Sequence, residues 1–225
     1  MDLDFEVLDS EGSPQATVIW LHGIGQEPSV LVPLARRMEL PAARVRSVFP
    51  SAPEQSVPLA RQKPAKAWFR QQIFRLDDPE TAGLERTESA LRELLAAESE
   101  RVGADRVMLA GFSQGAAMAL VTGLRYPQRL AGIALYAPYL VRAARIEETR
   151  GVANADVPIW IGHGRRDWII PYFLGEGVRD LLNELGHDVS WHRYRGGHEP
   201  FGEAAEDLRR FVDRAVDKPA ARQPD

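Results

Sequence analysis

A serine between two glycines is the residue of this sequence best suited to chemistry. Residues 111–115 read Gly-Phe-Ser-Gln-Gly, with an apolar run from Val107 to Ala110 before them and a segment of helical period after them. A G-x-S-x-G string between a buried strand and a helix is typical of a nucleophile elbow, a sharp turn that exposes the serine hydroxyl. Glycines at the flanks let the strand and the helix approach each other closely. Ser113 is therefore the candidate nucleophile.

The two partners that such a serine needs follow it in the expected order. A serine hydroxyl is a weak nucleophile at neutral pH and requires a histidine base and a group that orients the base. With this turn, the chain order is serine, then an acid, then histidine. Asp167 follows the apolar run at residues 158–161, and His198 follows two glycines after the last strand-like segment. We expect Asp167 to orient His198, and His198 to be the base; the alternatives are an N-cap aspartate and a structural loop histidine.

Four other histidines compete for the role of base. His22 and His163 each precede a glycine in a loop at a strand end, and we expect them to hold loop structure. His187 lies in a turn from helix to strand, and His192 lies in an alternating strand. Only His198 follows Asp167 at the end of a new strand.

Acyl transfer also requires donors for the oxyanion of the tetrahedral intermediate. These donors are usually the backbone N–H after the nucleophile and a second N–H from an earlier strand-end loop. Gln114 supplies the first. The glycine-containing string at residues 21–26 supplies the second, for which we choose Ile24; the alternative is an ordinary tight turn.

Aromatic side chains are candidates for the wall of an acyl pocket. Six of them stand near the motifs: Trp68, Phe69, Phe74, Trp168, Tyr172 and Phe173. Core packing is the usual fate of such residues. We expect a substrate-binding role only for Trp68 and Trp168.

Strand and helix patterns alternate along the chain. Apolar runs predict buried strands at residues 17–21, 44–49, 106–110, 130–135 and 158–161. Amphipathic stretches predict helices at residues 29–38, 79–98, 114–125, 172–185 and 204–216. This alternation predicts an α/β protein with a mostly parallel sheet, helices on both faces, and function beyond the carboxyl ends of the strands.

Local signals place some element ends. Asp78 and Pro79 read as an N-cap and first residue of a helix. Tyr126-Pro127 and Gly186 read as helix stops. Residues 189–194 alternate in polarity, as in a strand near a sheet edge, whereas residues 50–65 and 137–156 show little regular pattern.

These strings together resemble the phospholipase/carboxylesterase family of serine esterases, which includes acyl-protein thioesterases and lysophospholipases, within the α/β-hydrolase superfamily. The matching strings, in family order, are Leu21-His22-Gly23-Ile24-Gly25, Ala67-Trp68-Phe69, Gly111-Phe112-Ser113-Gln114-Gly115, His163-Gly164 with Asp167 and Pro171, and Gly197-His198. The resemblance implies the α/β-hydrolase fold without a large lid domain, the triad Ser113, Asp167 and His198, and oxyanion donors at Ile24 and Gln114. The chain departs from the family at Gln26, where an aspartate is common, and at Ala116, where glycine is common.

Composition bounds the remaining possibilities. The chain has 225 residues, no cysteine, 28 basic and 32 acidic residues and a net charge of -4. Without cysteine, thiol catalysis and cysteine-ligated metal sites are excluded. Scattered basic residues argue against nucleic acid as a partner. We expect one domain at residues 1–216, a polar tail at 217–225, no integral membrane association and, since residues 1–6 lack the features of a signal peptide, a cytoplasmic location.

The leading hypothesis is a carboxylesterase that cleaves esters or thioesters of small or single-chain substrates through an acyl-enzyme, with no cofactor and no metal. A lysophospholipase or acyl-protein thioesterase that acts on long acyl chains is the alternative within the family. An alternative of another class is a non-catalytic binding protein with the same fold, since fold does not fix function. A metallohydrolase is a weaker reading, because the sequence has no H-E-x-x-H string.

Overall fold

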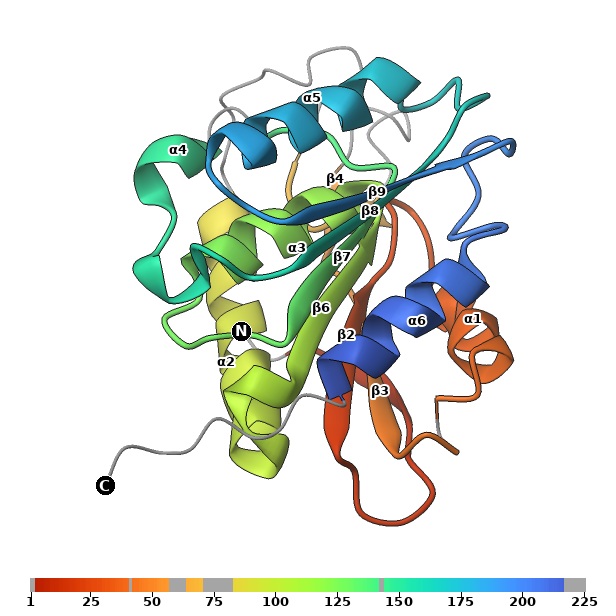
Figure 1. Ribbon diagram of the computed structural model, residues 1–225, viewed down its shortest axis with the longest axis vertical. Coiled ribbons are helices and arrows are strands. Elements are labelled where there is room, and N and C mark those ends of the chain that lie inside the picture. Colours follow the sequence, from red (N-terminus) through yellow and green to blue (C-terminus); the bar gives the residue numbers. More distant parts are fainter. Residues whose placement is uncertain (1–2, 41, 57–63, 71–82, 142–143, 217–225) are drawn as a thin grey trace.

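The computed structural model describes residues 3–40, 42–56, 64–70, 83–141 and 144–216. A seven-stranded sheet forms the centre, in the order β1-β3-β2-β6-β7-β8-β9 (Figure 1). The strands are β1 (Phe5–Leu8), β2 (Ala16–Leu21), β3 (Val45–Pro50), β6 (Val107–Phe112), β7 (Gly132–Tyr136), β8 (Ile159–Gly164) and β9 (Val189–Tyr194). All pair in parallel except β1, which runs antiparallel to β3. The chain thus has an α/β-hydrolase fold, and the predicted edge position of residues 189–194 is confirmed.

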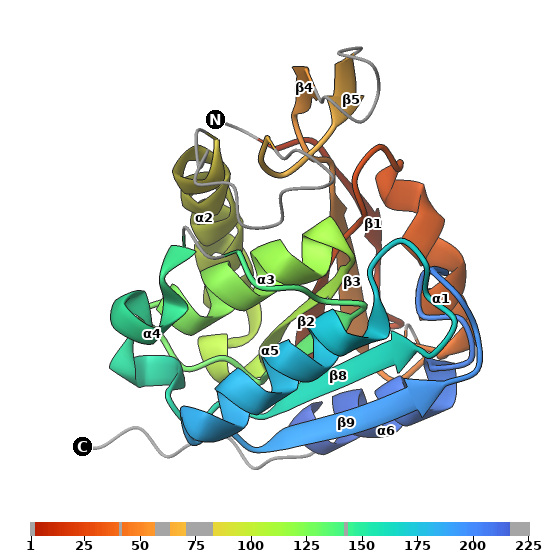
Figure 2. The ribbon, with the colours of Figure 1, turned by 90° about the horizontal axis from the view of Figure 1, so that it is seen from above.

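Helices cover both faces of the sheet, as Figure 2 shows. They are α1 (Val32–Arg37), α2 (Leu84–Val102), α3 (Gln114–Arg125), α4 (Ile146–Thr149), α5 (Tyr172–Glu184) and α6 (Ala205–Val216), with short 3-10 turns at Pro28–Leu31, Ala104–Arg106 and Val152–Asn154. The two predicted helix stops are confirmed, since α3 ends at Arg125 and α5 ends before Gly186, which has a positive φ of 87°. The predicted helix start at residues 78–79, Phe74 and the tail at 217–225 lie outside the described residues.

Alternating side chains of the central strands build one core on each face. Ile19 and Leu21 pack with α2, α3 and α5, whereas Val18 and Trp20 pack with α1 and α6. Burial on both faces explains why the strands read as continuous apolar runs. No helix in the described ranges is long and apolar enough to cross a bilayer.

Strand β1, the pair β4–β5 and the one-turn helix α4 were absent from the sequence-based prediction. Strand β1 keeps Phe5 and Val7 exposed, so it lacks the buried face that marks the inner strands. The stretch at 50–65, expected to be irregular, contains one strand of a short antiparallel pair, β4 (Glu54–Ser56) with β5 (Pro64–Lys66). Backbone pairing decides the two strand cases, and side-chain periodicity does not report it in segments this short; α4 likewise spans only four residues.

Candidate active site

Ser113 lies on the turn between β6 and α3, with φ 55° and ψ −118°. Such a backbone conformation costs a non-glycine residue of order 1–3 kcal/mol and persists only where the surroundings impose it. The surroundings here are backbone atoms in close contact. A Cβ on Gly111 would lie 2.3 Å from the carbonyl oxygen of Gly115, and a Cβ on Gly115 would lie 2.1 Å from the carbonyl oxygen of Leu21. Both glycines are therefore required for β2, β6 and α3 to meet beneath Ser113.

Three residues from different strand ends form a continuous hydrogen-bonded line. His198 Nε2 lies 3.0 Å from Ser113 Oγ, and His198 Nδ1 lies 2.6 Å from Asp167 Oδ2. Asp167 follows β8 and His198 follows β9, so the sheet brings together residues that are 31 and 85 positions apart. These distances fit the neutral imidazole that donates from Nδ1 to the carboxylate and accepts the serine proton at Nε2.

The carboxylate of Asp167 is fixed by its own loop, which we call the β8 loop (residues 165–171). Its Oδ1 accepts hydrogen bonds from the backbone N–H of Ile169 at 2.9 Å and of Ile170 at 2.8 Å. The Asp167 side chain is fully buried, while the His198 side chain is 14% exposed. The ring of Phe112 packs 4.7 Å from the His198 ring, centroid to centroid. The acid is thus held rigidly and the histidine is open to a ligand.

The loop after β2, which we call the β2 loop (residues 22–26), brings backbone N–H groups to the same end of the sheet. The N–H of Gly23 donates to Gln26 Oε1 at 2.9 Å, and that of Gly25 donates to the Lys66 carbonyl at 2.7 Å. Gln26 N donates to the Gly23 carbonyl at 3.2 Å. Among the described residues, the backbone N–H groups of residues 23, 25 and 26 are hydrogen-bonded, and that of Ile24 has no partner. The N–H of Gln114, at the start of α3, likewise has no acceptor inside the helix.

His22 ties the β2 loop to a more distant segment. Its Nδ1 donates to the Gly23 carbonyl at 2.8 Å, and its Nε2 accepts the N–H of Ala52 at 3.0 Å. Burial lowers the pKa of His22 to about 4, so the ring stays neutral at physiological pH, as this pair of bonds requires. Its geometry fits the loop-holding role expected from the sequence.

The side chains of Trp68 and Gln114 complete this network. Trp68 Nε1 donates to the His22 carbonyl at 2.7 Å. Gln114 Oε1 accepts from Trp68 N, and Gln114 Nε2 donates to the Phe69 carbonyl, both at 2.9 Å. Sequence reasoning gave Gln114 only a backbone role, and nothing local could have revealed these contacts, because their partners are 45 and 46 positions away.

The two tryptophans proposed for the substrate pocket have opposite environments. Trp68 is completely buried and its indole nitrogen is used inside the protein, whereas Trp168 is 91% exposed in the β8 loop, next to Asp167. Trp68 therefore supports the β2 loop, and Trp168 is available for contact with a ligand.

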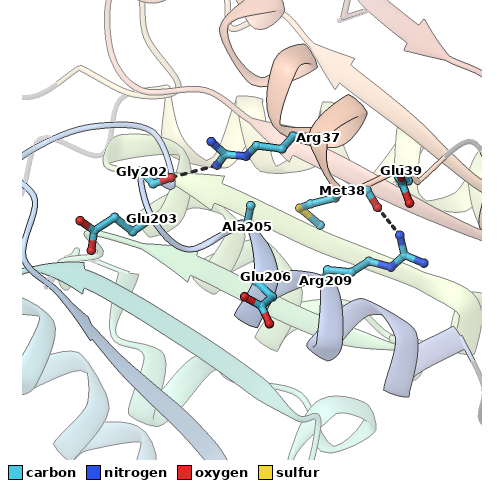
Figure 3. Close-up of a pocket in the computed structure, with 8 residues that line it drawn as sticks. All are labelled: Arg37, Met38, Glu39, Gly202, Glu203, Ala205, Glu206 and Arg209. Atoms are coloured by element: carbon cyan, nitrogen blue, oxygen red, sulfur yellow. Dashed lines mark hydrogen bonds between the residues drawn. The ribbon is translucent and has the colours of Figure 1, made fainter.

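A separate pocket of about 450 Å³ lies between the end of α1 and the start of α6. Figure 3 shows its lining residues: Arg37, Met38, Glu39, Gly202, Glu203, Ala205, Glu206 and Arg209. Arg37 donates to the Gly202 carbonyl at 2.9 Å, and Arg209 donates to the Met38 carbonyl. None of Ser113, Asp167 and His198 lines it. Among the described residues, no cluster of three or more histidine, aspartate or glutamate side chains could hold a metal ion.

Comparison with known proteins gives consistent matches over nearly the whole chain. A family profile described as Phospholipase/Carboxylesterase matches residues 3–216. Acyl-protein thioesterase 1 of Mycosarcoma maydis is 32% identical, over 90% of this chain and 92% of that protein. Acyl-protein thioesterase 1 of Neurospora crassa is 31% identical, over 91% and 89%. Among solved structures, esterase PE8 is 26% identical with a TM-score of 0.81, over 96% of this chain and all of that one.

Proposed function

The chain belongs to the phospholipase/carboxylesterase family, and from this premise we propose that it hydrolyses carboxylic or thio esters of small or single-chain substrates through an acyl-enzyme on Ser113. One observation carries the proposal: Ser113 Oγ, on a strained turn, is 3.0 Å from a histidine whose other nitrogen is 2.6 Å from a buried carboxylate. A serine, a base and an orienting group in this order form the template of nucleophilic acyl transfer.

The first half-reaction acylates the serine. His198 Nε2 takes the Ser113 proton while Oγ attacks the acyl carbon, and Asp167 stabilises the imidazolium that forms. The tetrahedral intermediate collapses when the bond to the alcohol or thiol breaks and His198 returns the proton to the leaving group. Water then repeats the sequence against the acyl-enzyme and releases the acid. No cofactor takes part in this proposal.

The N–H groups of Ile24 and Gln114 are the donors proposed for the oxyanion. Two observations support them: the other N–H groups of Gly23–Gln26 are already bonded, and Gln114 opens helix α3. The positive end of a helix adds to the stabilisation of negative charge at this point. Donors of this kind are worth about 10²–10³ in kcat each.

Substrate size separates this proposal from the second candidate within the family. Two relatives are named acyl-protein thioesterase 1, and these names favour the second candidate, a lysophospholipase or acyl-protein thioesterase. The sequence argues against this second candidate, because it has no long apolar insertion. We therefore expect a short cleft. Each buried CH₂ contributes about 0.8 kcal/mol, or about fourfold in kcat/KM, while the pocket has room. Rates on p-nitrophenyl esters should therefore peak at short to medium chains; a rise that continues to sixteen carbons would favour the second candidate.

Covalent labelling tests the proposal against a non-catalytic binding protein of the same fold. A fluorophosphonate should label the wild type and not Ser113→Ala, and this variant should lose roughly 10⁶ in kcat. Its stability should hardly change, because the turn loses only a hydroxyl. Labelling of Ser113→Ala, or more than a few per cent of the esterase rate in that variant, would remove Ser113 as the nucleophile. Rates that fall with a chelator would favour a metallohydrolase.

A further inference from the structure

His163 is the second-to-last residue of β8, and its ring lies close to the carboxylate of Asp167. Its ring is completely buried. Its Nε2 lies 2.9 Å from the carbonyl oxygen of Ile170 and 3.6 Å from Asp167 Oδ2. Asp167 Oδ2 is also the oxygen that contacts His198 Nδ1. The second distance is too long for a full hydrogen bond but short enough for an N–H dipole to favour negative charge on that oxygen.

Both atoms near Nε2 are acceptors, which assigns the proton of the ring to Nε2. The opposite nitrogen, Nδ1, is then an acceptor, and it is buried without a partner among the described residues. Leaving a buried polar atom unbonded carries a cost, which an apolar side chain of the same volume would avoid. Packing alone therefore does not explain an imidazole at this position.

The protein makes room for the ring at the expense of helix stability. Gly175 lies within α5, where glycine is unfavourable relative to alanine. A Cβ on Gly175 would lie only 2.1 Å from His163 Nδ1. The ring of Tyr172 closes another side, 5.5 Å from the imidazole between centroids. The fold thus fixes the orientation in which Nε2–H faces the β8 loop.

The ring is also held in its neutral form. The ionisable groups whose charges act on His163 are Asp167, His198 and Glu176. Burial lowers the pKa of His163 and outweighs the attraction of the two carboxylates. A neutral ring can donate to the loop without placing a positive charge beside Asp167, where it would compete with the imidazolium of His198.

We propose that His163 is a positioning residue for the reaction. Ile170 is held at both ends: its N–H binds Asp167 Oδ1 at 2.8 Å and its carbonyl binds His163 Nε2 at 2.9 Å. His163 thereby fixes the loop segment that orients the Asp167 carboxylate. Its N–H dipole also stabilises the negative charge on Asp167 Oδ2. This inference rests on the proposed function, since it concerns the same three residues.

Three substitutions at His163 separate the N–H from the bulk of the ring. In His163→Gln the amide nitrogen takes the place of Nε2, in His163→Asn it takes the place of Nδ1, and in His163→Leu no donor remains. We expect kcat on p-nitrophenyl acetate to fall by up to about 100-fold in the leucine and asparagine variants, with little change in KM, because displacement by about 1 Å suffices for such a loss. The glutamine variant should stay within about threefold of the wild type.

Two further readouts distinguish positioning from a general loss of structure. In His163→Leu the acid limb of the pH profile of kcat/KM should move to higher pH. The Asp167 carboxylate then lacks the N–H dipole of His163 beside it and stabilises the imidazolium of His198 more strongly. The far-downfield proton resonance of the His198–Asp167 bond should shift or broaden in this variant and return in His163→Gln. The leucine variant should unfold close to the temperature of the wild type, because removal of the unbonded Nδ1 offsets the loss of the donor to the Ile170 carbonyl.

Equal loss in the glutamine and leucine variants, or an unchanged rate and pH profile in His163→Leu, would overturn the inference. Fluorophosphonate labelling of each variant, with Ser113→Ala as the unlabelled control, keeps this outcome separate from failure of the proposed function. If His163→Leu labels as fast as the wild type while Ser113→Ala stays unlabelled, the triad stands and the role of His163 falls.

Discussion

The β2 loop and the β8 loop leave the sheet on either side of β6, and each contains or follows a buried, neutral histidine. In the β2 loop, both nitrogens of His22 are bonded, and Ala52, Trp68 and Gln114 reach the network from distant parts of the chain. In the β8 loop, the backbone N–H groups two and three positions after Asp167 bond its Oδ1, and His163 is four positions before it. The first two residues of this loop bond the backbone carbonyls of Tyr194 and Gly196, so its connection to the rest of the fold runs mainly through β9 and the segment after it.

This difference separates two ways of building a site. The β2 loop is a junction at which several segments meet, so its disturbance should lower the stability of the whole fold. Around Asp167 the β8 loop is a local turn whose backbone N–H groups act on one carboxylate, so a change there should lower the rate and leave stability nearly unchanged.

The largest expected effect comes from the β8 loop. Asp167→Asn keeps an oxygen that can accept from the N–H groups of Ile169 and Ile170, but it places an amide against His198 and favours the wrong tautomer. We expect kcat at neutral pH to fall by up to roughly 10⁴, with the thermal midpoint nearly unchanged. An undiminished rate would remove Asp167 as the orienting acid.

A change at the β2 junction should lower the stability of the fold in addition to the rate. In Gly115→Ala the new Cβ would meet the backbone oxygens of Leu21 and His22 at 2.1 and 2.6 Å, so β2 and α3 must separate. We expect the free energy of unfolding to fall by about 3 kcal/mol or more, as for a severe overpacking change. Denaturation in urea measures it.

Gly177→Ala in α5 is the control for this change, because a Cβ there would meet no atom within 4 Å. Alanine should stabilise the helix by roughly 0.5–1 kcal/mol. If both substitutions changed the free energy of unfolding equally, the β2 junction would tolerate the separation of β2 from α3. The contrast between the two loops would then fail.

The same contrast explains what the sequence could and could not reveal. Ser113 and Asp167 follow apolar strands, and His198 follows a strand of alternating polarity; each lies within three residues of a glycine, so local patterns predicted their positions. The parallel sheet then brings such strand ends together. The bonds of the Gln114 side chain and the burial of Trp68 depend on which distant segments meet at the β2 loop. No local pattern contains that information.

The β2 loop should also respond to pH. His22 has a pKa of about 4 in the folded protein against an ordinary 6.5, so between these values the unfolded chain binds more protons. Stability should therefore fall as pH drops from about 6.5 to 4, by about 3 kcal/mol from this group at the lower end. The lowered pKa values of the buried His163 and His187 act in the same direction.

A comparison of wild type with His22→Asn isolates this contribution from that of the carboxylates. The variant should be less stable at pH 7, because the N–H of Ala52 loses its acceptor, but its stability should decline less between pH 6.5 and 4. Urea denaturation at several pH values gives both curves. If the free energy of unfolding of the two proteins changed in parallel with pH, His22 would titrate alike in the folded and unfolded states. Burial would then not hold the ring neutral.

The smallest expected effect concerns the exposed end of the β8 loop, where Trp168 stands beside Asp167. A side chain that is 91% exposed contributes little to folding, so Trp168→Ala should change the free energy of unfolding by no more than about 0.5 kcal/mol. If the indole lies along the acyl chain of the substrate, its partial burial is worth about 1 kcal/mol, or about fivefold in kcat/KM. The loss should appear in KM rather than in kcat, because the contact is the same in the ground state and the transition state.

The loss in Trp168→Ala should be absent for the acetate ester and grow towards the octanoate ester. The control is Phe5→Ala, which removes an exposed aromatic side chain on β1 and should show no dependence on chain length. An equal loss for acetate and octanoate would assign Trp168 to the shape of the β8 loop and not to the substrate.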